Sequence, residues 1–107
     1  VIGNDAVTLR CVEGMNPSPI SETDCPAWDK VASAVAGTWQ GSLVSPYLMV
    51  QCSDSRHYGP VSNHVYRFSA MDLTAEERST IHGNNERIRT EVIGRAVEFY
   101  IRLMSQC

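Results

Sequence analysis

The hydrophobic pattern along much of the chain is typical of short β-strands. Residues 6–14 alternate apolar and polar side chains, which predicts a strand with one buried face. Residues 43–52 contain the unbroken apolar run YLMV, as expected for a strand that is covered on both faces in a parallel sheet. Residues 64–69 predict another short strand, so together these segments indicate a small sheet of a few strands.

Three other segments have the apolar spacing of α-helices. They comprise residues 24–39, 73–83 and 90–106. In the first segment, Pro26 suits the opening turn of a helix and Gly37 is a stop signal. In the second, Thr74 and Glu77 have the spacing of a capping box, and Gly83 predicts the end of the helix.

The third helical segment is strongly amphipathic. Its predicted inner face repeats at helical spacing and comprises Val92, Ala96, Tyr100 and Leu103. Glu91 and Arg95, like Glu98 and Arg102, stand four residues apart in the order that stabilises a helix. We therefore expect a long helix near the end of the chain.

A proline-rich stretch divides the chain. Residues 15–26 contain three prolines, and each removes a backbone donor and disfavours helix before it. This stretch reads as a linker and a domain boundary, with residues 1–16 before it and residues 17–107 forming the main unit. The order strand, linker, helix, strand, loop, strand, helix, helix predicts the α/β fold class, with a short parallel-type sheet flanked by helices.

Composition limits the possible functions. The chain has 107 residues and a net charge of -3, which argues against a nucleic-acid surface. No apolar run approaches the roughly 18 residues that would span a bilayer. The first residues lack a basic region followed by an apolar one, so no signal peptide is visible. We expect a soluble chain whose cellular compartment the sequence does not specify.

The four cysteines do not form a recognisable motif. They are Cys11, Cys25, Cys52 and Cys107, and no C-x-x-C pair exists among them. A zinc ribbon or a redox motif therefore has little support. Two disulfides are possible on number alone, but four cysteines are too few to indicate a disulfide scaffold in a chain of this size, which favours reduced thiols.

Chemically useful side chains gather between residues 51 and 69. Ser53 follows an apolar run, and the loop after a buried parallel strand is where open α/β sheets place ligands. Ser53 could bind an anionic group, and Arg56 could pair with a carboxylate through two parallel hydrogen bonds. The alternative is structural: Ser53 caps a short helix, Asp54 lies in its first turn and Arg56 forms a local salt bridge.

His82 is the second candidate. The histidines His57, His64 and His82 have no spacing that would place two on one helix face, so no metal site within the chain is indicated. A histidine before Gly83 can interact with the end of a helix. It can also be a metal ligand, with Asn85 and Glu86 supporting it. Spacing leaves both interpretations open.

Three motifs, in this order, resemble a known family. The segments SDSRHY, VYRF and IHGNNERI are similar to the carboxyl-terminal end of M20 zinc metallopeptidases, in the Gly-X carboxypeptidase or carboxypeptidase S branch. The resemblance covers residues 17–107. It implies part of a three-layer zinc-peptidase catalytic domain. It also implies that residues 1–16 end a lid or dimerisation domain with its last strand.

The resemblance also implies roles for individual residues. His82 would be a metal ligand and Asn85 and Glu86 its outer support. The strand-end loop would bind substrate through Ser53, Cys52 and Arg56, with Asp54 as a supporting residue. Cys52 stands where the family tends to have Gly, and Ser53 where it has Thr.

The family's other metal ligands and its general base have no counterpart in the chain. Zinc needs three or four ligands, and this chain would supply one. The chain is therefore predicted to be a segment of a metal-dependent carboxypeptidase or amidohydrolase, inactive alone, with the upstream catalytic segment as its partner. A peptide or N-acyl amino acid would be the substrate, and an oligomer is possible. The alternatives are a non-enzymatic α/β interaction module and one half of a two-chain enzyme.

Overall fold

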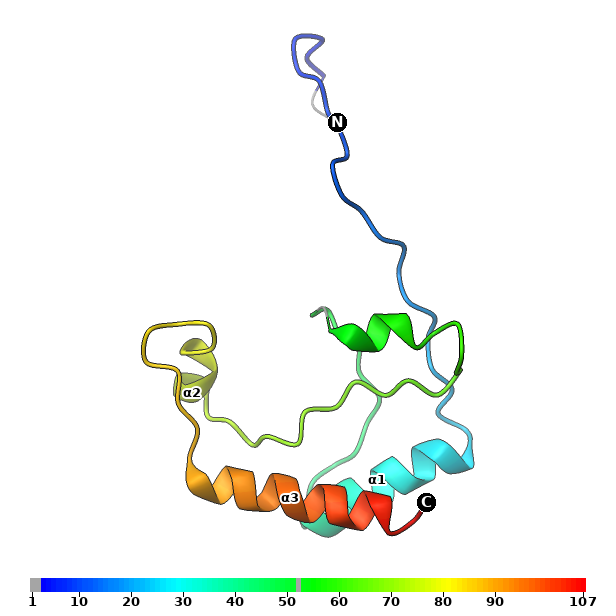
Figure 1. Cartoon of the computed structure of the whole chain (residues 1–107), viewed down its shortest axis with the longest axis vertical. Helices are drawn as coiled ribbons and strands as arrows, with labels where there is room; N and C mark the ends of the chain where they lie inside the picture. The colour runs from blue at the N-terminus through cyan, green and yellow to red at the C-terminus, as the bar shows by residue number, and fades with distance from the viewer. Residues whose placement is uncertain (1–2, 52) are drawn as a thin grey trace.

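The computed structural model describes residues 3–51 and 53–107, and within them the secondary structure is helical. Its elements are α1 (Pro26–Thr38), the 3-10 helix η1 (Asp54–His57), α2 (Ala75–Ser79) and α3 (Thr90–Met104). Figure 1 shows α1 and α3 next to each other, with η1 and α2 on one side of this pair. No helix in the described part of the chain is long and apolar enough to cross a membrane.

Helices α1 and α2 begin where the local sequence signals predict. Pro26 occupies the first turn of α1, which continues through Gly37 and ends at Thr38. Thr74 and Glu77 form the predicted capping box at the start of α2. That helix ends at Ser79, earlier than predicted, so the residues up to Gly83 form a turn.

Helix α3 confirms the predicted amphipathic segment, but the residues on its buried side differ in part from those predicted. Val92 and Phe99 are buried, whereas the predicted Tyr100 is exposed. Arg102 pairs with Glu98 at 2.7 Å, as expected for residues four apart. Arg95 instead lies 3.6 Å from the Asp72 carboxylate, outside its own helix.

The core is a small cluster around the ring of Phe99, which is only 2% exposed. Its ring centroid lies 4.9 Å from that of Phe68 and 5.8 Å from that of Trp39. Ala34 and Val35 of α1 complete the cluster from the other helix. Phe99 therefore joins α1, α3 and the extended segment that carries Phe68.

The predicted α/β fold is wrong for the part of the chain that the structure describes. Residues 3–51 and 53–107 contain no strand, so neither the parallel-type sheet nor the lid strand is present there. Val65 illustrates the reason: its backbone N–H and C=O both bond to the Ser21 hydroxyl, at 3.0 and 2.9 Å, instead of to a neighbouring strand. An apolar run favours an extended backbone, but a strand also needs a paired backbone beside it.

The chain is open rather than closely packed. Its radius of gyration is 18.4 Å, compared with about 13 Å for a compact domain of this length. Residues 3–16 project away from the helices (Figure 1). Apolar side chains remain in solvent, and Leu43 and Tyr47 are each 94% exposed. Large apolar side chains left in solvent in this number are compatible with a face that another surface covers.

Replacing Phe99 tests whether its ring is the centre of the fold. Phe99→Ala is expected to lower the free energy of unfolding by about 3–5 kcal/mol, because it leaves a cavity where three segments meet. Ile101→Ala, on the exposed side of the same helix, should cost about 0.5 kcal/mol. Urea unfolding followed by circular dichroism measures both, and equal losses would contradict the assignment.

Candidate functional site

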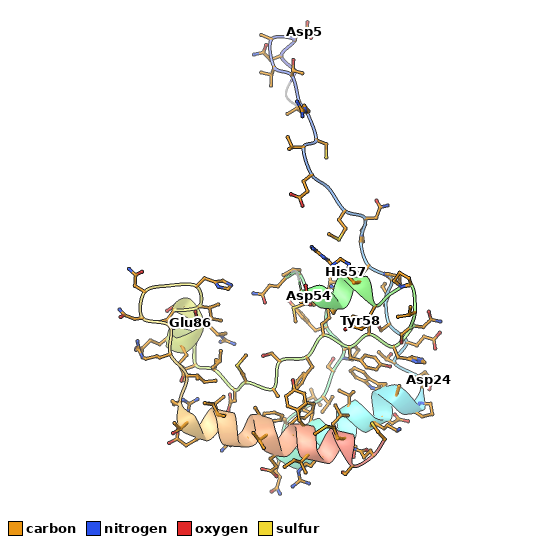
Figure 2. The ribbon with its side chains drawn as sticks, in the orientation of Figure 1. Asp5, Asp24, Asp54, His57, Tyr58 and Glu86 are labelled. Atoms are coloured by element: carbon orange, nitrogen blue, oxygen red, sulfur yellow. The ribbon has the colours of Figure 1, made fainter. Side chains whose placement is uncertain are left out.

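The predicted site residues lie on two separate polar segments. One is η1 with the residue before it, and the other is the turn between α2 and α3. Figure 2 shows Asp54 and His57 on the first and Glu86 on the second. The described contacts of Ser53 and His82 are to neighbours within their own segments.

Ser53 is the first residue of the η1 turn. Its backbone carbonyl accepts from the Arg56 N–H at 3.2 Å, and its hydroxyl lies 2.5 Å from that of Ser55. Asp54 is exposed in the first turn. The Arg56 Nε–H donates to His57 Nε2 at 3.1 Å. Ser53 occupies the N-cap position and Asp54 the first turn, as the structural alternative predicted, but the Ser53 side chain makes no capping hydrogen bond. The side chains of Ser53 and Asp54 are exposed. Cys52 lies outside the described residues.

His82 occupies a tight turn and is exposed. Its φ of 61° is in the left-handed region, the one such angle among non-glycine residues of the described chain. The Gly83 N–H donates to the Thr80 carbonyl at 2.8 Å and closes the turn. A Cβ added at Gly83 would lie 3.0 Å from that carbonyl oxygen, so any larger residue there would push against the backbone of the turn. His82 is thus presented to solvent on a short, constrained loop.

The residues after His82 support its backbone rather than its ring. A Glu86 carboxylate oxygen accepts from the His82 backbone N–H at 3.2 Å. The Asn85 carbonyl accepts from Arg87 at 3.4 Å, and the Asn85 side chain is exposed. Glu86 therefore keeps residue 82 in its left-handed conformation and leaves the imidazole unconstrained by this contact.

The base of the turn is held by Glu77, which is 7% exposed and is the one buried charged residue of the described chain. One Glu77 oxygen accepts from the Thr74 N–H at 2.7 Å, and the other from the Arg89 Nε–H at 2.8 Å. The Arg89 hydrogen bond, followed by the Thr74 one, lowers the pKa of Glu77 to about 2. The same ion pair raises the pKa of Arg89.

These residues are insufficient to hold zinc by themselves. In residues 3–51 and 53–107 no three His, Cys, Asp or Glu side chains gather closely enough to bind a metal ion. Zinc is normally held by three or four such ligands. His82 offers one imidazole, and the Glu86 carboxylate bonds to the His82 backbone.

Sequence reasoning missed two polar contacts. Arg89 has no local signal that pairs it with Glu77, twelve residues earlier. The Tyr66 hydroxyl donates to the Glu22 carbonyl at 2.7 Å and lies 3.2 Å from the Cys25 sulfur. Burial, followed by the hydrogen bond with Cys25, raises the pKa of Tyr66 to about 12. Only the capping spacing of Glu77 was visible beforehand.

Comparison with known proteins identifies the family. The chain is 35% identical over 104 residues to the N-fatty-acyl-amino acid synthase/hydrolase PM20D1 of Xenopus tropicalis, covering 96% of this chain and 20% of that protein. The chain belongs to the M20 family. A probable carboxypeptidase S-like protein of Dictyostelium discoideum is 27% identical over 97% of this chain and 20% of its own length. An uncharacterized carboxypeptidase of Schizosaccharomyces pombe is 30% identical over 80% of this chain and 15% of its own length.

These matches confirm the predicted M20 membership, and the names of the relatives describe a synthase/hydrolase and carboxypeptidases. The chain spans about a fifth of the length of the curated relatives it matches, at 20% of each of the first two. No protein-family profile matches it. No solved structure matches it either.

Adding one methyl group at residue 83 tests the close contact between Gly83 and the Thr80 carbonyl. Gly83→Ala is expected to destabilise the turn by about 1 kcal/mol, because its Cβ meets the Thr80 carbonyl. Amide hydrogen exchange at residues 82 and 83 should then be about fivefold faster. Gly94→Ala is the matched control: nothing lies within 4 Å of its Cβ, and it should stabilise α3 by about 0.5–1 kcal/mol. Unchanged exchange in Gly83→Ala would contradict the close contact.

The depressed pKa of Glu77 predicts acid sensitivity of α2 and its turn. The ionised carboxylate stabilises the folded state fully above the ordinary pKa of 4.5, and this contribution is lost as the pH falls toward about 2. Amide protection of residues 74–83 should therefore decline across that interval, as followed by NMR. In Glu77→Gln the decline should be absent and protection lower throughout. An identical acid transition in both proteins would refute the role of Glu77.

Proposed function

We propose that this chain is a carboxyl-terminal segment of a metal-dependent M20 hydrolase. The parent enzyme would cleave the amide bond next to a carboxyl-terminal residue, in a peptide or an N-acyl amino acid. The main support is the sequence match to the Xenopus tropicalis synthase/hydrolase, which covers 96% of this chain and 20% of that protein. Within this assignment, residues 1–16 belong to a lid or dimerisation domain and residues 17–107 to the catalytic domain.

His82 is the residue proposed to bind zinc, as one ligand of a centre whose other ligands lie elsewhere in the parent polypeptide. Its exposure and its constrained turn support this role, since a ligand must be both accessible and positioned. Glu86 acts through the His82 backbone. Asn85, exposed beside it, completes the outer support.

Ser53 and Arg56 are proposed to bind the substrate carboxylate. A hydroxyl and a guanidinium within one short turn suit an anionic group, because both donate hydrogen bonds and Arg56 adds opposite charge. Cys52, directly before Ser53, would line the same site. Asp54 follows in the first turn of η1 and would orient this segment.

The rest of the parent polypeptide is the proposed partner, and the uncovered apolar surface supports this. The outer side of α3 exposes five large apolar residues: Ile93, Val97, Tyr100, Ile101 and Met104. A cavity of about 620 Å³ lies beside α1 and is lined by Trp28, Tyr47 and Phe68 among others. Exposed apolar side chains and an open apolar cavity of this kind are normally covered by another part of the protein. The chain matches only about 20% of the length of its Xenopus tropicalis relative.

The proposal is tested by removing His82 from the full-length protein that contains this chain. His82→Ala is expected to reduce zinc affinity by about 100-fold or more, together with hydrolysis of N-acyl amino acids, because it removes a direct ligand. Chelator competition and a hydrolysis assay measure the two effects.

His64→Ala provides the matched control, because that imidazole pairs with Glu22 at 3.5 Å, outside the proposed site. It should leave both quantities within about twofold. If His82→Ala retained zinc and activity, the proposed role of His82 would be wrong. If the 107-residue chain alone hydrolysed substrate, the segment assignment would be wrong. Binding of the isolated chain to another protein without any hydrolysis in the full-length form would favour an interaction module.

A further inference from the structure

We propose that Glu77 and Arg89 form a clamp that positions His82, an inference that rests on the proposed function of His82 as a metal ligand. Neither residue belongs to the proposed zinc or substrate contacts. Both lie at the base of the loop that carries His82, and they are joined at 2.8 Å. They are positioning residues, which act through the loop backbone.

The Glu77 carboxylate connects two segments by using each oxygen once. One oxygen caps the start of α2 through the Thr74 N–H at 2.7 Å. The other bonds to Arg89, the residue that precedes α3. The Glu77 side chain is 9% exposed and that of Arg89 is 50% exposed, so the carboxylate end of this ion pair is shielded from solvent while the guanidinium end is not. The two ends of the loop are therefore held at one point.

Arg89 closes the same junction from the other side. Its Nη2–H donates to the Asp72 carbonyl at 2.8 Å, while its Nε–H donates to Glu77. One guanidinium thus joins the residues before α2, within α2 and before α3. Lysine cannot reproduce this pattern, because it is a single point charge without a planar fork.

The turn above the clamp has little packing of its own. Residues 81–87 are all exposed, including Ile81 and His82, so apolar contacts do not hold them. The turn depends on backbone hydrogen bonds and on Glu86. Its position relative to the body of the protein is therefore set at the base of the loop, by Glu77 and Arg89.

The neighbouring pair of Glu76 and Arg87 provides a matched control. It also joins α2 to the end of the loop, with 2.6 Å between Arg87 Nη2 and Glu76 Oε1, but both side chains are exposed. Exposed pairs of this kind contribute little. The two ion pairs thus differ mainly in the carboxylate, which is exposed in Glu76 and buried in Glu77, one residue apart on α2.

The test uses four variants of the full-length hydrolase: Glu77→Gln, Arg89→Lys, Arg87→Met and His82→Ala. Zinc affinity, measured by chelator competition, is expected to fall about tenfold in the first two, as for other outer partners of metal ligands. Their kcat should fall by a similar factor while KM stays within about twofold, because substrate contacts are untouched. Arg87→Met should match the unmodified protein in all three quantities.

The outcomes separate this inference from the proposed function. If His82→Ala loses zinc while Glu77→Gln and Arg89→Lys retain normal affinity and kcat, the clamp is refuted and His82 remains a ligand. If His82→Ala also retains zinc, both proposals fail. Circular dichroism confirms folding of each variant, and Arg89→Lys keeps the test valid should Glu77→Gln not fold. A loss as large in Arg87→Met would also refute a specific role for the Glu77–Arg89 pair.

Discussion

The ring of Phe99 brings together three stretches of chain that are far apart in sequence. It lies on α3, packs against Trp39 after α1, and meets Phe68 on the extended segment between η1 and α2. Aromatic rings bury large areas and pack at tilted angles, so one residue can contact several neighbours at once. Because few other side chains are buried in the described chain, the mutual placement of α1 and α3 depends on this cluster.

So small a core explains why the two polar segments are held by hydrogen bonds. Neither η1 nor the turn that carries His82 has a buried apolar residue of its own. The η1 turn is closed by the bond from the Arg56 N–H to the Ser53 carbonyl, and the base of the His82 turn is held by the carboxylate of Glu77. A polar group shielded from solvent fixes geometry more sharply than apolar contact does, because hydrogen bonds are directional. That precision suits segments that present side chains to a ligand.

The proposed segment role offers an explanation for the uneven distribution of apolar surface. The matches cover 96% and 97% of this chain but only 20% of each of the first two relatives. The outer side of α3 and the segment around Tyr47 expose apolar side chains that a monomeric domain of this length would bury. The proposed segment role relates these observations: the apolar faces meet the remaining polypeptide, while the polar turns contribute to a shared site.

Local signals in the sequence determined the helices and the capping box, because Pro26, Thr74 and Glu77 act on residues within one helical turn of themselves. The motifs around Ser53 and His82 also sufficed to indicate the family. Tertiary structure alone decided that no sheet forms in the described chain, since a strand depends on a partner that its own residues do not specify. It likewise chose Phe99 over Tyr100 for the core and Arg89 as the partner of Glu77, because those choices depend on how distant segments pack.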